Sequence, residues 1–97
     1  MSLVVKLEDD LGERSEWVIL NGVLPGASDA GYVLLKGVDP FGKTVFNHMQ
    51  MEAFLAEWDQ ARERVRDESQ MEAWTRVKQM AEACRLDRDL YLRFVGN

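Results

Sequence analysis

The sequence predicts an α+β fold in which a small, mainly antiparallel β-sheet of about four strands carries two consecutive amphipathic helices on one face. Three observations predict it. The stretch from Gln50 to Asp89 contains no Gly or Pro and spaces its apolar residues three and four apart, as in helices. Short apolar runs near both ends of the chain alternate with the period of strands. Turn residues cluster between these segments, and a sheet is the economical layer for covering two apolar helix stripes.

The N-terminal end of the chain predicts a strand followed by a turn. Residues Leu3–Glu8 are rich in Val and Leu and alternate imperfectly between apolar and polar side chains, as in a half-buried strand. The next four residues, Asp9–Gly12, combine two Asp with a Gly, which is typical of a turn. We therefore expect the first strand to end at this turn.

The segment Trp17–Leu24 is compatible with two structures. As a strand it would be apolar on both faces. As a short helix it would begin with Ser15 as the N-cap, stack its large apolar side chains on one side and end at Pro25. Gly22 weakens either structure, by about 1 kcal/mol relative to Ala in a helix. We expect the short helix, followed by a loop over Pro25–Gly31.

The middle of the chain predicts a β-hairpin whose second strand leads directly into a helix. Strands are expected over Tyr32–Val38 and Thr44–Asn47, because apolar residues lie on both sides of the turn residues Asp39–Lys43. Pro40 presets φ for the first central position of the turn, and Gly42 is expected to supply a positive φ.

Two helices joined by a tight turn are expected between Gln50 and Asp89, in preference to one long helix. The pattern breaks at Asp67–Ser69, and Ser69 with Glu72 forms a capping-box sequence. The alternating residues Leu90–Val95 predict a closing strand. The two apolar stripes consist of Met51, Phe54, Leu55, Trp58, Ala61 and Val65, and of Met71, Trp74, Val77, Ala81 and Cys84.

Size and charge limit the classes of function. The 97 residues predict a single domain spanning residues 1–97, and 46% of them are hydrophobic, enough for one core. The formal net charge is −5 and both halves of the chain are acidic, so neither nucleic acid nor an anionic membrane is an expected partner. The single cysteine favours a reducing compartment, and there is no signal-peptide pattern or run of ~20 apolar residues, which together predict a cytoplasmic protein.

No residue pattern predicts catalysis, a cofactor or a metal site. One His and one Cys, without HxxxH, CxxC or HExxH spacing, leave no ligand set for zinc. Cys84 lies on the apolar stripe of the second helix, where a small buried thiol is expected. His48 lies between the hairpin and the first helix, where capping or packing is expected rather than proton transfer. A small enzyme that uses His48 with a nearby carboxylate is therefore the least favoured hypothesis.

Aromatic and polar side chains at the turn and in the last strand predict a surface for a partner. Phe41 lies at the tip of the turn, and Tyr91 shares a strand face with Arg93, away from the apolar face. Packing under a neighbouring element is the simpler explanation for both aromatics; otherwise they mark a contact patch. The polar residues after the hairpin are expected beside Phe41, unless Asn47 caps the helix. The predicted partner-binding residues are Phe41, Asn47, His48, Gln50, Tyr91 and Arg93.

These segments resemble a family of small bacterial proteins of unknown function. The family pattern is a DP[FY]GxTVFN core, then a glutamine, an FLxEW helix and a YLxFxG ending. The likeness covers about two-thirds of the chain; the N-terminal third departs more, and Gly37 stands where the family has a basic or aromatic residue. The resemblance implies an uncharacterised bacterial cytoplasmic protein and carries over no catalytic residue. The matching residues are Val38–Asn47, Gln50, Phe54-Leu55, Glu57-Trp58 and Tyr91–Gly96.

We therefore expect a non-enzymatic protein-binding module, either a regulatory protein or an immunity- or antitoxin-like factor that covers part of a partner. The reason for this expectation is that the chain is a small acidic domain without an arrangement of residues typical of catalysis. The alternative is a structural module in which the same surface pairs two copies of the chain.

Overall fold

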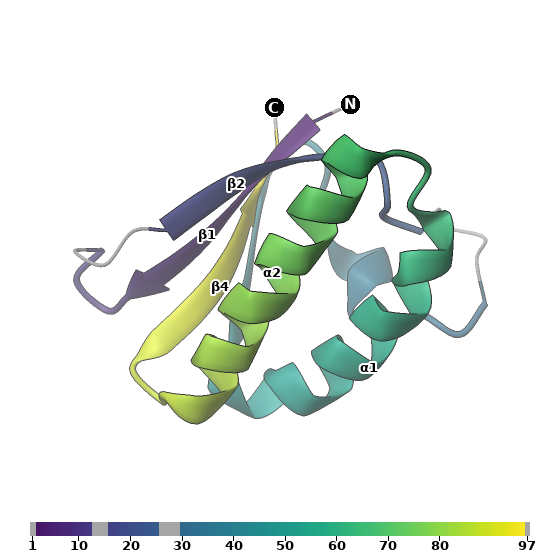
Figure 1. Cartoon of the computed structure of the whole chain (residues 1–97). Coiled ribbons are helices and arrows are strands. Elements are labelled where there is room, and N and C mark those ends of the chain that lie inside the picture. Colours follow the sequence, from purple (N-terminus) through teal and green to yellow (C-terminus); the bar gives the residue numbers. More distant parts are fainter. Residues whose placement is uncertain (1, 13–15, 26–29, 97) are drawn as a thin grey trace.

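The structure is a computed structural model that describes residues 2–12, 16–25 and 30–96. It has the predicted architecture, a four-stranded antiparallel sheet with two helices on one face (Figure 1). Short 3-10 helices lie before β3, before α1 and between the two α-helices. The elements are β1 (Ser2–Asp9), β2 (Glu16–Asn21), η1 (Leu35–Gly37), β3 (Lys43–Asn47), η2 (His48–Gln50), α1 (Met51–Ala61), η3 (Arg62–Arg64), α2 (Glu68–Leu86) and β4 (Leu90–Val95).

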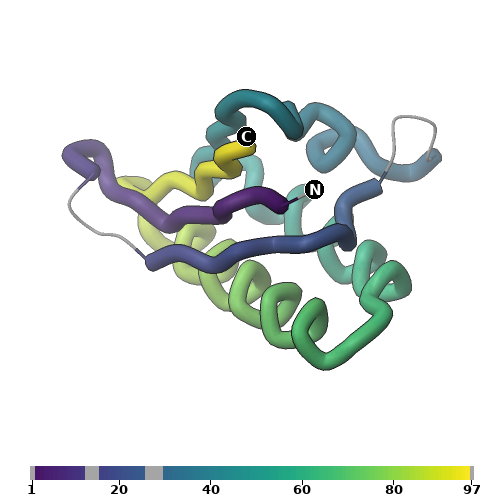
Figure 2. The backbone as a smooth tube through the Cα atoms, turned by 90° about the horizontal axis from the view of Figure 1, so that it is seen from above, coloured from purple at the N-terminus to yellow at the C-terminus, as the bar shows by residue number. Residues whose placement is uncertain are grey.

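The strand order is β2-β1-β4-β3, so the first and last strands of the chain form the centre of the sheet. They pair in antiparallel register from Val4 opposite Val95 to Asp9 opposite Leu90. Figure 2 shows β2, β1 and β4 side by side. The predicted closing strand is confirmed, and the sheet is complete only when the C-terminal segment has docked.

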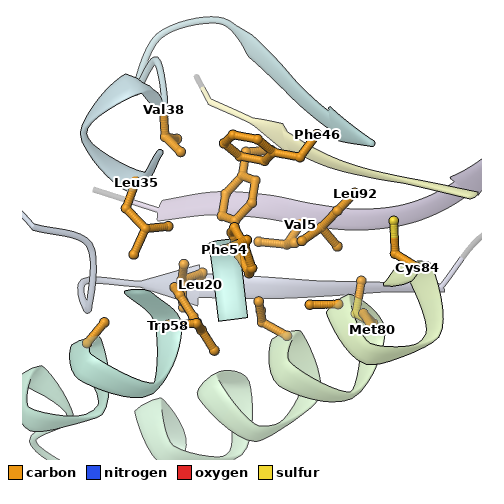
Figure 3. Close-up of a cluster of buried hydrophobic side chains, with 14 of the residues drawn as sticks. Val5, Leu20, Leu35, Val38, Phe46, Phe54, Trp58, Met80, Cys84 and Leu92 are labelled. Atoms are coloured by element: carbon orange, nitrogen blue, oxygen red, sulfur yellow. The ribbon is translucent and has the colours of Figure 1, made fainter. Parts of the chain in front are cut away.

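The face of the sheet toward the helices carries the hydrophobic core. In β4 every second residue is buried, and β1 shows the same alternation over most of its length. α2 contacts β2 and β4, and α1 packs against α2. Figure 3 shows side chains from the sheet and from both helices meeting between the two layers. The largest buried residues include Leu7, Leu20, Phe46, Met51, Phe54, Trp58, Trp74, Met80, Leu92 and Phe94.

Two tryptophans join α1 to α2 through reciprocal hydrogen bonds. Trp58 Nε1 donates to the carbonyl oxygen of Trp74 at 3.0 Å, and Trp74 Nε1 donates to the carbonyl oxygen of Trp58 at 2.9 Å. Trp58 lies in the last turn of α1, where backbone carbonyls lack a donor within the helix. The indole of Trp74 supplies that donor. The two rings are stacked, with an interplanar angle of 7° and centroids 6.5 Å apart.

The expected helix over Trp17–Leu24 is wrong, because these residues form β2 and the bend after it. Its backbone pairs with β1 from Ser2 opposite Asn21 to Leu7 opposite Glu16. The strand ends at Asn21, and the next two residues, Gly22 and Val23, have φ values of 74° and 73°. The expected N-cap, Ser15, and residues 26–29 of the expected loop lie outside the described residues.

The expected hairpin is also wrong in its first strand. Residues Tyr32–Val38 form turns and the short helix η1, and β3 pairs with β4 instead. The reason is a contact distant in sequence: the carboxylate of Glu57 on α1 accepts hydrogen bonds from the backbone N–H groups of Leu34 and Leu35, both at 3.0 Å. These donors therefore point at α1 and are not offered to a strand.

The turn at Asp39–Gly42 is confirmed, but Gly42 does not have a positive φ. Gly42 N–H donates to the carbonyl oxygen of Asp39 at 3.3 Å, and the Asp39 side chain accepts from Phe41 N–H at 2.9 Å. Asp at the first position, Pro at the second and Gly at the fourth are the preferences of a type I turn, which needs no left-handed residue. The sequence therefore predicted the position of the turn but not its type.

The break between the two helices is confirmed, and its cap is not the one expected. Asp67 is the N-cap of α2, since its side chain accepts from Gln70 N–H at 2.8 Å, whereas Ser69 lies inside the helix. The Gln70 side chain bonds in two directions. It accepts from Arg66 N–H at 2.7 Å and donates to the carbonyl oxygen of Asn21 at 3.0 Å, which ties the start of α2 to the end of β2.

We expect Trp74→Phe to destabilise the fold by about 1–3 kcal/mol, because it removes one indole donor and leaves the buried carbonyl of Trp58 without it. Urea unfolding followed by circular dichroism measures the change. Trp17→Phe is the matched control and should stay within about 0.5 kcal/mol, because Trp17 is 55% exposed. Equal effects of the two substitutions would show that the bond from Trp74 Nε1 to the Trp58 carbonyl contributes nothing.

We expect Gly96→Ala to cost about 1–3 kcal/mol, because a Cβ at Gly96 would overlap the backbone of Pro40 and Phe41. Gly96 N–H also donates to the carbonyl oxygen of Gly42 at 2.7 Å, so the turn cannot move away without losing that bond. Gly37→Ala is the control, since a Cβ there meets nothing within 4 Å. Thermal unfolding should separate the two variants, and an unchanged melting temperature for Gly96→Ala would contradict the close approach.

Candidate functional site

The strongest candidate site is the face of the sheet opposite to α1 and α2, which we call the open face. Among the described elements no helix lies on it (Figure 1). Its residues alternate with the buried ones along every strand, and those on the edge strands are exposed. The open face consists of Ser2, Val4, Lys6, Glu8, Trp17, Ile19, Asn21, Lys43, Val45, Asn47, Tyr91, Arg93 and Val95.

The strand register arranges these side chains in rows across the four strands. The middle row is Trp17, Lys6, Arg93 and Val45, in the order of the strands. The large apolar side chains at its two ends are exposed to solvent, since Trp17 is 55% and Val45 47% exposed. Directly opposed side chains on one face of a sheet contact one another, so each row forms a continuous surface. The next row is Ile19, Val4, Val95 and Lys43, in which Ile19 is 49% exposed.

The open face is basic although the whole chain is acidic. It carries three basic side chains and one carboxylate, on a chain whose formal net charge is −5. The carboxylate of Glu8 lies 3.5 Å from Nη1 of Arg93 and offsets part of that charge. The basic side chains are Lys6, Lys43 and Arg93. The open face is basic whereas the remainder of the surface is acidic, and this difference favours a partner whose contact surface is acidic.

Three of the six predicted partner-binding residues lie on the open face. Tyr91 and Arg93 share it, as predicted from the alternation of β4, and Asn47 stands opposite Tyr91 in the register. A hydrogen bond to the carboxylate of Asp10, together with the charge of that carboxylate, raises the pKa of Tyr91 above its usual value. The Tyr91 hydroxyl donates this hydrogen bond to Asp10, so it is engaged within the fold at one end of this face.

The other three predicted residues lie elsewhere. Phe41 is 72% exposed in the turn before β3, whereas His48 and Gln50 follow the far end of that strand, which Asn47 terminates, so the structure does not bring these polar residues beside Phe41. Asn47 and Gln50 form a capping box for η2, in which the Asn47 side chain accepts from Met49 and Gln50 N–H and the Gln50 side chain accepts from Asn47 N–H. Their oxygens are therefore engaged within the fold.

Sequence reasoning missed the residues that give the open face its apolar character. Trp17 and Ile19 were placed on a helix, which would have put Trp17 on the same side as the buried Leu20. In β2 they point to the side opposite to Leu20. The signal was present in the sequence, because β-branched residues and apolar character on both faces fit a strand.

The described residues offer no arrangement typical of an active site. None of their polar or charged residues is buried, and no group of three or more His, Cys, Asp or Glu among them could hold a metal ion. Cys84 is completely buried, with Sγ 3.4 Å from the carbonyl oxygen of Leu90. His48 is half-buried at the start of η2, and no hydrogen bond or ion pair joins its side chain to another described residue.

A polar hollow between the end of β2 and the start of α2 is a weaker candidate. Its volume is about 490 Å³. Val23, whose φ of 73° is unusual for a β-branched residue, lies in its wall. Arg64 and Arg66 line it together with Glu63, so both basic and acidic groups are present. None of these charged side chains is buried, which leaves no charged group held in a fixed, desolvated position for a ligand.

Neither helix in the described part of the chain is long and apolar enough to cross a membrane. No protein-family model matches the chain, and the comparisons with curated proteins and with solved structures found no match. The resemblance to small bacterial proteins stays a prediction.

We expect Cys84 to make the fold less stable at alkaline pH. Burial, with the charge of Asp87 as the second cause, raises the pKa of this thiol from 9.0 to about 11. As the pH rises, the Cys84 thiol therefore loses its proton at a lower pH in the unfolded chain than in the folded protein. The thiol's stabilising contribution is complete below about pH 9 and declines as the pH rises toward 11, by up to about 2 kcal/mol.

Urea unfolding of the unchanged protein and of Cys84→Ala, under reducing conditions between pH 7 and pH 10.5, isolates this contribution from other titrating groups. The difference in unfolding free energy between the two proteins should be constant near neutral pH. Above pH 9 the unchanged protein should become less stable relative to Cys84→Ala. A difference that stays constant over the whole range would show that the thiol titrates alike in both states.

Proposed function

We propose that this protein is a non-enzymatic protein-binding module and that the open face is its contact surface. The observation that carries the proposal is the exposure of Trp17, Ile19 and Val45 on a sheet face that no described helix covers. Large apolar groups gathered on one face of a soluble fold are typical of an interaction surface.

The composition of the open face is that of a protein interface. Trp, Tyr and Arg are the residues most enriched among those that dominate binding energy, and Trp17, Tyr91 and Arg93 all belong to this face. Apolar groups lie along the middle and next rows, and charged groups lie among them. A partner that covers the face would remove the apolar surface from water and pair the charged groups that lie among it.

The biological setting completes the proposal. A module that binds through a rigid sheet, without a catalytic constellation among its described residues, acts by covering a surface of its partner. Immunity proteins, antitoxins and regulatory inhibitors act in this way. The single cysteine and the resemblance to small bacterial proteins support the cytoplasm of a bacterium as the place where it acts.

Site-specific photocrosslinking tests this proposal. A benzophenone amino acid introduced at Ile19 should give one dominant crosslinked protein in lysate of the source cells. Adding Trp17→Ser should reduce that product at least tenfold, because hot-spot aromatics contribute about 2 kcal/mol or more. Trp17 is exposed, so circular dichroism should show an unchanged fold.

Leu86→Ser, added to the same crosslinking chain, is the matched control. Leu86 is 80% exposed at the end of α2 and does not belong to the open face, so the product should persist. Equal loss with both substitutions, or no loss with Trp17→Ser, would contradict the open face as the contact surface. A product that consists of two copies of this chain would replace the proposed partner with self-association.

A further inference from the structure

Two basic side chains lie directly opposite each other at the centre of the open face. Lys6 on β1 and Arg93 on β4 are register partners, and both point to the same face. Like charges in this position destabilise a sheet. Both belong to the central strands, so the register holds their backbone positions directly opposite each other.

The sheet relieves this opposition only in part. Arg93 has an ion pair with Glu8 at 3.5 Å, while its Nε atom is buried and without a hydrogen-bond partner in the described structure. Among the described residues Lys6 has no ion pair. At the centre of the face, the buried Nε of Arg93 thus lacks a hydrogen-bond partner and Lys6 lacks an ion pair among the described residues, and apolar side chains stand around them.

We infer that the partner presents an acidic segment, with an Asp or Glu carboxylate bound between Lys6 and Arg93 and an apolar neighbour lying on Trp17 and Ile19. This inference rests on the function proposed above and names the chemistry of the occupant. The carboxylate accepts charge-assisted hydrogen bonds from both cations and removes their mutual repulsion. The adjoining row of Ile19, Val4 and Val95 receives the apolar side chain.

The same observations argue against the other occupants. A second copy placed face to face would bring Lys6 and Arg93 of one chain against the same cations of the other, since a two-fold interface pairs identical patches. A nucleic acid gains affinity from several phosphate contacts and from aromatic stacking. The open face offers three basic side chains, and most of its apolar groups are aliphatic.

Charge reversal in the crosslinking chain tests the inference. With the benzophenone at Ile19, Lys6→Glu should reduce the crosslinked product at least tenfold, while Lys36→Glu, the same charge change on η1, should leave it unchanged. Mass spectrometry of the product should find an Asp or Glu next to an apolar residue at the crosslinked segment. A separate measurement tests the repulsion between Lys6 and Arg93. Lys6→Gln should raise the melting temperature at low salt, and Lys36→Gln should not.

The outcomes separate this inference from the function on which it rests. If Trp17→Ser abolishes the product and Lys6→Glu does not, the contact surface stands and the acidic partner is wrong. If neither reduces it, both fail. A nuclease-sensitive product, or one containing two copies of this chain, overturns the acidic protein segment, and a lower melting temperature for Lys6→Gln overturns the repulsion between the two cations.

Discussion

The contact between Trp58 and Trp74 determines where α1 lies, and much of the fold follows from that position. Each indole donates to the backbone carbonyl of the other tryptophan, so the separation of the two helices is set by hydrogen bonds as well as by packing. Once α1 is placed, Glu57 faces the segment before β3 and binds its backbone N–H groups. Phe54, stacked on Trp58, then contacts Phe46 and Phe94 of the sheet. One buried aromatic cluster thus joins both helices to the strands.

Both helices are used on one side of the sheet, and this leaves the other side to solvent. A sheet that is covered on one face usually carries polar residues on the other. Here the edge strands depart from that rule at Trp17, Ile19 and Val45, which remain about half exposed. Nothing in the described fold is stabilised by their exposure, so their presence is better explained by what the face contacts than by folding.

The sequence predicted those parts whose pattern is local. The helical stripes of α1 and α2, the alternation of β4 and the Asp39–Gly42 turn all follow from residues close together in the chain. The strand β2 was missed because its outward side chains are apolar, so the residues of the open face removed the alternation that marks a strand. The first strand of the expected hairpin failed because Glu57, far along the chain, takes up its backbone donors. Likewise, Tyr91 and Arg93 were identified from β4 alone, whereas their neighbours Lys6 and Trp17 depend on strand order.

Strand order also links the proposed site to the stability of the whole fold. The centre of the open face combines residues from the first and last strands of the chain, so it exists only when β4 has docked against β1. A partner bound there contacts the folded state and not the unfolded chain, and it therefore stabilises the fold in proportion to its concentration and affinity. In the free protein the repulsion between Lys6 and Arg93 has the opposite effect, because it lowers the stability of the fold. The same two side chains would then lower the stability of the free protein and raise that of the complex, which links binding to folding at the centre of the sheet.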